Sequence, residues 1–484
     1  MRLRTALGLL VCFVYLNQAV HGTGTKVTYR KSGTTEGKFL VKTVNPDDAA
    51  STINPNDVAT IATNPDDVAA VKSLYMSTNG RNWSININWM KGDPCSSPDG
   101  SPWYGITCST INNERRIVEI YLDGYNLEGT IPTDIRKLSE LQTLNLRNNK
   151  LNGMLQHAVF QIHTLQCIDL SINSITGPLP TKLSMPNLNT LILRMNHLTG
   201  SITAVWNAPK LRFLNLDNNQ FTGNLPKGIS SLQSLWEFTL YQNHLTGPLP
   251  ASYGKLSNLS VFLLHQNRFQ YNSIPKSWSG LKSLTEISLD GLRGSIPSTI
   301  AQDWPKIESL DLGNGQLTGK IPTSICECRN LYSIKLYNNA LHGPLPHCIC
   351  TMRNIDIIDI SNNQISGPIP SCIGNVSLFE LNLSHNNLTG TIPELAANVS
   401  NNFRTFDISH NSFHGALPTS LNLLNLWNFI INDNHLTSVS GVESFFTRLR
   451  FNILDGSCAM DNNPWRCPIP SYVPPSCNAT CEPH

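Results

Sequence analysis

The sequence has little net charge and no long hydrophobic run. Its 484 residues include 35 Lys and Arg against 33 Asp and Glu, and charged residues make up only 14% of the chain. A balance this close to neutral gives no electrostatic reason to expect nucleic acid or an anionic membrane as a partner. No segment reaches the run of about 18 apolar residues that a transmembrane helix needs. We therefore expect no nucleic-acid partner and no transmembrane span.

Motifs for catalysis and for cofactor binding are also missing from the sequence. It contains no H-E-x-x-H, no G-x-S-x-G and no Walker loop. The thirteen histidines are scattered along the chain. We therefore expect neither an enzyme nor a cofactor or metal site.

The first 22 residues have the features of a secretory signal peptide. Arg2 and Arg4 precede an apolar run from Ala6 to Leu16, and small residues follow near Gly22. Without Cys12 the mature chain keeps twelve cysteines, an even number that suits an oxidising compartment. We therefore expect the protein to be secreted or at the extracellular surface. Seven N-x-S/T sequons agree with this route: Asn82, Asn258, Asn375, Asn382, Asn387, Asn398 and Asn478.

A unit of about 24 residues recurs from Ile117 to the region of Ser440. It runs L-x-x-L-x-L-x-x-N-x-L-x-G-x-I-P, as at 211–226 and 355–370. Such units bury their apolar side chains only by stacking on their neighbours, and the alternating L-x-L segment is typical of a half-buried strand. We predict fourteen stacked coils whose strands form one parallel sheet on the inside of a curve. Their leading residues are 117, 141, 165, 188, 211, 235, 259, 284, 307, 331, 355, 378, 403 and 426.

Asparagine recurs at the ninth position of the unit. A buried side-chain amide can satisfy backbone groups where a strand turns away, so we expect these residues to form a structural ladder. The coil at Leu284 has lost two residues, including the ladder asparagine, and the coil at Ile307 has Gly315 there. We expect a local irregularity in curvature at these two coils. The ladder residues are Asn149, Asn173, Asn196, Asn219, Asn243, Asn267, Asn339, Asn363, Asn386, Asn411 and Asn434.

The segments outside the repeats predict a leader and two caps. After the signal peptide (1–22), residues 23–65 predict a flexible leader that contains three N-P-(D/N)-D-x-A sequences. Only the third copy, at 64–69, leads into an apolar-periodic stretch and predicts a helix. Residues 66–116 predict an N-terminal cap, residues 117–440 the repeats, and residues 441–484 a Cys-rich C-terminal cap. The first cap contains Trp83, Trp89, Trp103 and a predicted Cys95–Cys108 disulfide. The second contains Trp465 and two predicted disulfides whose pairing the sequence leaves open, among Cys458, Cys467, Cys477 and Cys481.

Five more cysteines cluster in the coils at Ile307, Leu331 and Ile355. A zinc site is one interpretation, because C-x-C pairs can bind this metal. Equivalent places in stacked coils lie about 5 Å apart, which favours the disulfides Cys326–Cys350 and Cys348–Cys372 instead. This pairing leaves Cys167 and Cys328, which would be free or bridge to another chain.

Two groups of side chains on the predicted concave face are candidates for ligand binding. Aromatic anchors in such a position are typical of sites for proteins or sugars. Lateral packing of the rings is the alternative for the first group, and pairing of the charges among themselves is the alternative for the second. A glycan on Asn382 would block the face beyond its coil. The first group is Phe213, Trp236, Tyr241, Leu263 and His265, expected close together; the second is Asp311, Tyr332, Lys335, Tyr337 and Asp359.

The repeat resembles the plant-specific class of leucine-rich repeats, whose L-x-G-x-I-P signature appears as LEGTIP (127–132), LTGPLP (245–250), LTGKIP (317–322) and LTGTIP (388–393). The stretch 83–108 is similar to the N-terminal cap of that class. The stretch 463–467 is similar to a C-terminal cap motif, with Ile469 in place of its usual cysteine. The resemblance implies an α/β solenoid: a right-handed superhelix with a parallel inner β-sheet and disulfide-bonded caps. It also implies extracellular recognition, as in receptor-like ectodomains and polygalacturonase-inhibiting proteins.

Three functions are compatible with these features. The leading hypothesis is a secreted, non-enzymatic recognition protein that binds a protein or glycan through the concave face. The second is an inhibitor of a secreted cell-wall-degrading glycosidase. The third is a structural matrix or adhesion component, for which Cys167 or Cys328 would provide intermolecular cross-links.

Overall fold

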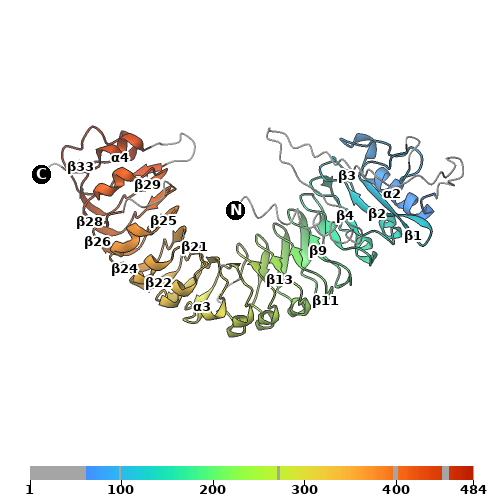
Figure 1. Ribbon diagram of the computed structural model, residues 1–484, viewed down its shortest axis with the longest axis horizontal. Helices are drawn as coiled ribbons and strands as arrows, with labels where there is room; N and C mark the ends of the chain where they lie inside the picture. Colours follow the sequence, from blue (N-terminus) through green and yellow to red (C-terminus); the bar gives the residue numbers. More distant parts are fainter. Residues whose placement is uncertain (1–61, 97–99, 270–272, 396–401, 450–456, 483–484) are drawn as a thin grey trace, which may run out of the picture.

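The protein forms an open arc with one cap at each end (Figure 1). The computed structural model describes residues 62–96, 100–269, 273–395, 402–449 and 457–482. The signal peptide, the first two leader sequences and the Asn398 sequon lie outside these residues. Stacked coils with a continuous inner sheet confirm the predicted leucine-rich repeat solenoid.

The inner sheet has sixteen strands, and all its neighbours pair in parallel except β1 and β2. In each coil the middle strand residue is apolar and points into the core, as do the buried Leu214, Phe238 and Phe262 of three successive coils. Residues on either side of it face the concave surface. The strands are β1 (Ile106–Ile111), β2 (Glu114–Tyr121), β4 (Thr143–Asn145), β6 (Cys167–Asp169), β9 (Thr190–Ile192), β12 (Phe213–Asn215), β14 (Glu237–Thr239), β16 (Val261–Leu263), β17 (Glu286–Ser288), β19 (Ser309–Asp311), β21 (Ser333–Lys335), β23 (Ile357–Asp359), β25 (Glu380–Asn382), β27 (Thr405–Asp407), β29 (Asn428–Ile430) and β31 (Ser457–Ala459).

The L-x-G segments form further parallel sheets on one flank of the arc, which the sequence analysis did not predict. Among the described residues, a four-stranded flank sheet ends at β15 and a seven-stranded one begins at β18. Between these two strands lies the coil at Leu259, whose residues 270–272 are outside the described part of the chain. The flank strands are β3 (Glu128–Gly129) with β5 (Lys150–Leu151); β7 (Thr176–Gly177), β10 (His197–Ser201), β13 (Gln220–Asn224) and β15 (His244–Thr246); and β18 (Arg293–Gly294), β20 (Gln316–Gly319), β22 (Ala340–Gly343), β24 (Gln364–Gly367), β26 (Asn387–Gly390), β28 (Ser412–Ala416) and β30 (His435–Ser438).

Short 3₁₀ turns form most of the convex side, and most of them follow directly after the proline of the repeat. The proline fixes its own φ and cannot extend the flank strand, so the chain turns there. Two coils instead have the paired strands β8 (Lys182–Ser184) and β11 (Val205–Asn207), and one has α3 (Ile300–Asp303). The turns are η2 (Thr133–Lys137), η3 (His157–Gln161), η4 (Lys227–Ser231), η5 (Ala251–Lys255), η6 (Lys276–Gly280), η7 (Thr323–Glu327), η8 (His347–Thr351), η9 (Ser371–Asn375) and η10 (Thr419–Leu423).

The asparagine ladder is present and is structural. The Asn219 amide nitrogen donates to the carbonyl oxygens of Leu193, Leu216 and Asp217 at 3.0, 3.2 and 3.0 Å. Its side-chain oxygen accepts from the Leu198 N–H at 3.0 Å. Asn463 of the C-terminal cap makes the same set of bonds and adds one more rung, which the sequence analysis missed. The ladder thus holds each coil to the one before it.

The N-terminal cap begins with helix α2 (Pro65–Ser77), which confirms the helix predicted after the third leader sequence. The Asn64 side chain accepts from the Asp66 N–H at 2.9 Å, and Pro65 occupies the first helical position. The short turn η1 (Gly80–Asn82) follows. The three tryptophans are buried beside Tyr75, with ring centroids 4.7–5.7 Å apart, and Cys95 bonds to Cys108.

A buried ion pair ties this cap to the first coil. The Asp67 carboxylate is fully buried and lies 2.9 Å from the Arg116 guanidinium. It also accepts from the Ile117 N–H at 2.8 Å. Hydrogen bonding to Asp67 raises the pKa of Arg116, so the guanidinium stays charged.

The C-terminal cap contains helix α4 (Glu443–Arg448), the turn η11 (Pro475–Cys477) and the paired strands β32 (Trp465–Arg466) and β33 (Cys481–Glu482). Trp465 is 1% exposed, and its indole N–H donates to the Met460 carbonyl at 2.8 Å. The disulfides are Cys458–Cys477 and Cys467–Cys481.

The predicted cysteine pairing within the repeats is wrong. The disulfides are Cys326–Cys348 and Cys350–Cys372, with Cα atoms 5.9 and 5.7 Å apart. The prediction applied the stacking of strands to residues that lie in the turns η7, η8 and η9. A 3₁₀ turn rotates its side chains about its axis, so the fourth residue of one turn faces the second residue of the next.

Of the two cysteines expected to be left over, Cys328 is free as predicted and Cys167 is not. Cys167 is disulfide-bonded, so among the described residues only Cys328 has a free thiol. Cys328 is 3% exposed, and burial raises the pKa of its thiol to about 11. A buried, protonated thiol is a poor nucleophile, which removes the basis for an intermolecular bridge through it.

Candidate ligand-binding surface

The concave face presents its side chains in columns that run from coil to coil. Strand pairing aligns residues at equal positions of the unit, as in Asn215, Thr239 and Leu263. Neighbours in a column lie about 4.8 Å apart. The third and fifth positions flank the buried middle residue of the strand, and the seventh lies just beyond its end. A ligand on this face would contact several coils at once.

Phe213 does not form the exposed anchor that was expected. Its side chain is 6% exposed because the Trp236 ring packs against it at a centroid distance of 5.5 Å. The Arg212 guanidinium lies 5.7 Å from the Phe213 ring. Lateral packing, the alternative interpretation, therefore describes Phe213, while Trp236 stays half-buried and partly open to solvent.

Tyr241 and His265 form a second aromatic pair. Their rings are stacked at 4.7 Å with an interplanar angle of 5°, and both are half-buried. They occupy the seventh column, whereas Phe213 occupies the third, so the two pairs are separated by about 13 Å along the strands. The five residues expected close together are thus two pairs, with Leu263 half-buried in the column between them.

Acidic side chains lie beside both aromatic pairs: Glu237 neighbours Phe213 in the third column, and Asp217 neighbours Tyr241 in the seventh. Asp217 is 1% exposed and accepts from the Thr239 hydroxyl and the Tyr241 N–H, both at 3.1 Å. Burial raises the pKa of Asp217 well above its ordinary value. Burial, assisted by the negative charge of Glu286, raises the pKa of Glu237 to about 7. The centre of the face therefore changes its charge near neutral pH.

Three buried polar atoms at this surface have no hydrogen-bond partner among the described residues, one of them Ser288 Oγ in the fifth column. The other two are Arg194 Nε and His265 Nδ1, both in the seventh column. Leaving such a group unpaired costs about 1–3 kcal/mol, and most buried polar groups in proteins are paired. A ligand that supplies the missing partners would recover this free energy.

The second candidate group lies on the next coils. Asp311, Lys335 and Asp359 are neighbours in the fifth column, which alternates in charge. Among the described residues Lys335 has no ion pair within 4.0 Å. Asp311, Lys335 and Asp359 therefore do not form ion pairs with one another. Burial and nearby carboxylates raise the pKa of Tyr337 to about 12, and Tyr332 is half-buried at the second position.

The sequons differ in accessibility. Asn382 is half-buried in β25 on the concave face, and its side-chain oxygen accepts from the Ser384 N–H and hydroxyl at 3.1 and 2.8 Å. Glycosylation of the sequons stays a prediction, and a glycan on Asn382 would confine the binding surface to earlier coils. The exposed sequon asparagines are Asn82, Asn258, Asn375, Asn387 and Asn478.

Comparisons with known proteins agree with this architecture. The Leucine Rich Repeat family matches residues 210–232, 354–376 and 377–399. Phytosulfokine receptor 1 of Arabidopsis thaliana is 35% identical over 91 residues, 19% of this chain and 9% of that receptor. Protein STRUBBELIG-RECEPTOR FAMILY 3 of the same plant is 31% identical over 128 residues, 26% of this chain and 15% of that protein. The matches thus cover only a small part of these curated relatives.

Solved structures of plant receptors are similar over most of the chain. The Arabidopsis receptor kinase HAESA, in complex with the peptide hormone IDA and the co-receptor SERK1, has a TM-score of 0.66 and 26% identity, and the match covers 83% of this chain and 70% of that one. The plant peptide hormone receptor RGFR1, in complex with RGF2, has a TM-score of 0.63 and 26% identity, covering 75% and 64%.

No helix in the described part of the chain is long and apolar enough to cross a membrane. The three Leucine Rich Repeat matches fall within the repeats. This chain is therefore a plant-type leucine-rich repeat protein, similar to the extracellular domains of plant receptor-like kinases.

Proposed function

We propose that this protein is a secreted, non-enzymatic recognition protein that binds an extracellular peptide through its concave face. The supporting observation is the surface on the coils from Leu188 to Ile307. There, buried polar atoms without partners lie beside partly exposed aromatic rings. The likeness to plant receptors solved with peptide hormones supports a peptide over a glycan.

The chemistry of the surface suits an extended peptide. Arg194 Nε is a donor without a partner, and His265 Nδ1 can donate or accept according to its tautomer. A peptide backbone provides both acceptors and donors at intervals that can match successive coils. The stacked Tyr241 and His265 rings provide a rigid platform for an apolar or planar side chain.

Charge gives the peptide a preferred composition. Asp217, Glu237 and Asp311 are acidic groups on this surface, and burial raises the pKa of each of them. A basic peptide side chain beside them would favour their ionised forms. We therefore expect bound peptides to contain Lys or Arg and to bind more tightly at pH 8 than at pH 5.

Selection from a displayed library of random peptides tests the proposal. Peptides enriched on the purified protein are measured against Tyr241→Ala and against Trp427→Ala. Trp427 is 44% exposed at the second position of a distant coil, so it serves as a matched aromatic control. We expect Tyr241→Ala to weaken binding by about tenfold or more and Trp427→Ala to leave it unchanged. Failure to enrich peptides, or equal binding by both variants, would overturn the proposal.

Two other hypotheses are separated from it by simple assays. A glycosidase inhibitor would reduce the activity of secreted polygalacturonases, and we expect no reduction across a panel of such enzymes. A cross-linked matrix component would give covalent oligomers on a non-reducing gel. Because the Cys328 thiol is buried, we expect a monomeric band.

A further inference from the structure

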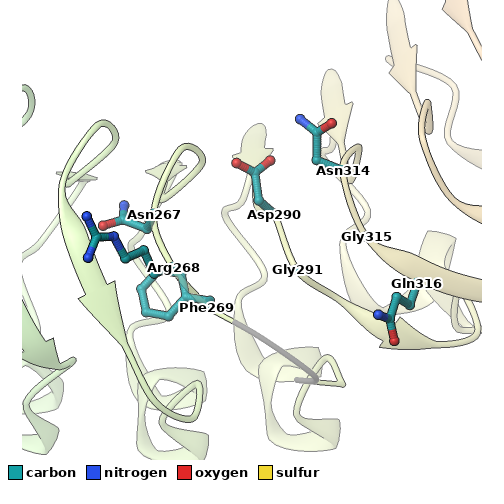
Figure 2. Close-up of a pocket in the computed structure, with 8 residues that line it drawn as sticks. All are labelled: Asn267, Arg268, Phe269, Asp290, Gly291, Asn314, Gly315 and Gln316. Atoms are coloured by element: carbon teal, nitrogen blue, oxygen red, sulfur yellow. The ribbon is translucent and has the colours of Figure 1, made fainter.

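The irregular coil at Leu284 leaves a pocket on the flank of the solenoid. The pocket has a volume of about 520 Å³ and lies between the coils at Leu259 and Ile307. Figure 2 shows Asn267, Arg268 and Phe269 on one coil, Asp290 and Gly291 on the next, and Asn314 beyond them. This is the step at which the asparagine ladder loses a rung.

In the regular coils two backbone N–H groups of this flank donate to the next coil. The Asn219 N–H donates to the Gln242 carbonyl at 3.2 Å. The Phe221 N–H donates to the side-chain oxygen of the ladder residue Asn243 at 3.0 Å. A carboxamide oxygen is therefore the usual acceptor at this place, and it recurs along the ladder.

At the irregular step both bonds are missing. Asn267 and Phe269 correspond to Asn219 and Phe221, and among the described residues neither of their N–H groups has an acceptor. The Gln266 N–H donates to the Asp290 carboxylate in place of a backbone carbonyl. The coil at Leu284 is too short to reach these donors, because Gly291, with φ +72°, replaces the longer turn.

The following step has no room for a ladder side chain. A Cβ atom added at Gly315 would lie 2.8 Å from the Leu292 carbonyl oxygen and 2.7 Å from the Asn339 side-chain oxygen. The coil at Ile307 therefore closes directly onto the coil at Leu284. The space left by the two deleted residues stays on the side of Asn267 and Phe269.

The lining of the pocket defines the chemistry of its ligand. The Asn267 and Phe269 N–H groups require an acceptor, and the Asp290 carboxylate accepts hydrogen bonds. Figure 2 shows the Arg268 side chain pointing away from Asp290, so a carboxylate ligand near Asp290 would be repelled, whereas a neutral group that both accepts and donates satisfies all three. We propose that this pocket binds a primary carboxamide, the side-chain group of Asn or Gln, in the role that a ladder asparagine has elsewhere.

Amide-resolved NMR on the whole protein tests the proposal, which does not rest on peptide binding by the concave face. We expect the Asn267 and Phe269 amide protons to exchange with solvent faster than those of Asn219 and Phe221. Addition of N-acetylglutamine methylamide should shift and protect the first two and leave the second two unchanged. N-acetylglutamate methylamide, which has the same shape, should bind about tenfold more weakly because of its charge.

Two variants sharpen the test. Insertion of two asparagines between Asp290 and Gly291 restores the regular repeat, so it should protect the Phe269 amide and abolish binding of the glutamine probe. Asp290→Asn keeps an acceptor for the Gln266 N–H but removes the charge. It should reduce the discrimination between the two probes to less than threefold, and it remains informative if the insertion does not fold.

Three results would overturn the proposal. The first is an absence of shifts at Asn267 and Phe269 with the glutamine probe at tens of millimolar, roughly the range expected for one small polar group. The second is equal binding of the glutamine and glutamate probes by the unmodified protein. The third is a response to glucose as large as that to the glutamine probe, since this would indicate a general polar pocket.

Discussion

Replacing Glu237 with glutamine should stabilise the protein at alkaline pH and leave its stability unchanged in acid. Burial on the concave face, with the charge of Glu286 nearby, raises the pKa of Glu237 from 4.5 to about 7. The folded state therefore holds the proton at a pH where the unfolded chain has lost it. Stability is unaffected below pH 4.5, falls as the pH rises to about 7, and stays lower above that.

The size of the effect follows from the two pKa values. A difference of about 2.5 corresponds to roughly 3 kcal/mol, and partial exposure of the side chain reduces this to about 2–3 kcal/mol. Glutamine imitates the protonated acid and does not ionise. Glu237→Gln should therefore raise the free energy of unfolding by about 2–3 kcal/mol at pH 8 and by less than about 0.5 kcal/mol at pH 4.

Urea unfolding followed by circular dichroism at the two pH values measures this difference. Glu327→Gln is the control, because Glu327 is exposed on the convex side and its replacement should have little effect at either pH. An equal gain in unfolding free energy for Glu237→Gln at pH 4 and pH 8 would show that ionisation of Glu237 does not destabilise the folded state. The raised pKa of Glu237 would then be refuted.

Three further substitutions test the scaffold. Asn219→Ala removes four hydrogen bonds and leaves the Leu198 N–H without its acceptor, so urea unfolding should show a loss of about 3–4 kcal/mol. Replacing both Cys350 and Cys372 with serine opens a loop with a sequence separation of 22, and should lower the unfolding free energy by about 3 kcal/mol. Asp67→Ala leaves the Arg116 charge buried without its partner, and should cost about 3–5 kcal/mol and release α2, seen as faster amide exchange there.

Each of these substitutions has a control and an opposing outcome. Gln220 is next to Asn219 in the sequence and its side chain is exposed, so Gln220→Ala should leave the unfolding free energy unchanged. An equal loss of stability for Gln220→Ala and Asn219→Ala would contradict the role of the ladder. Mass spectrometry of the non-reduced protein should find the Cys326–Cys348 disulfide. Finding Cys326–Cys350 instead would favour the pairing predicted from the sequence. Asp66→Ala changes an exposed neighbour of Asp67, so release of α2 by both variants would assign the effect to helix capping.

The parts of the fold that repeat could be predicted from the sequence. The positions of the inner strands follow from L-x-L, and the role of Asn219 follows from its place in the unit, because each coil meets the same neighbours as the last. Asn463 was missed since its segment starts with Cys458 and Met460 in place of leucines. Its position three residues after Met460 matches the ladder spacing and could have identified it.

Contacts between different positions of neighbouring coils could not be predicted in this way. Phe213, at the third position of its coil, is covered by Trp236, at the second position of the next coil. Cys326 bonds to Cys348 because the geometry of 3₁₀ turns, absent from the repeat pattern, sets which side chains face each other. The Asp67–Arg116 pair joins a helix to a strand 49 residues away, and no period relates them.

The centre of the arc combines a weak flank with a well-filled core. At the step from the coil at Leu259 to the coil at Leu284 the ladder lacks a rung, so among the described residues fewer hydrogen bonds join these two coils. On the convex side of the same region Tyr253, Trp278 and Trp304 are buried, and each donates a hydrogen bond to the carbonyl of an earlier coil at 3.0 Å. These aromatic side chains hold the coils together from the side opposite the concave face. The solenoid can therefore tolerate unpaired donors at Asn267 and Phe269, and loss of Trp278 should open this region before the regular coils on either side of it.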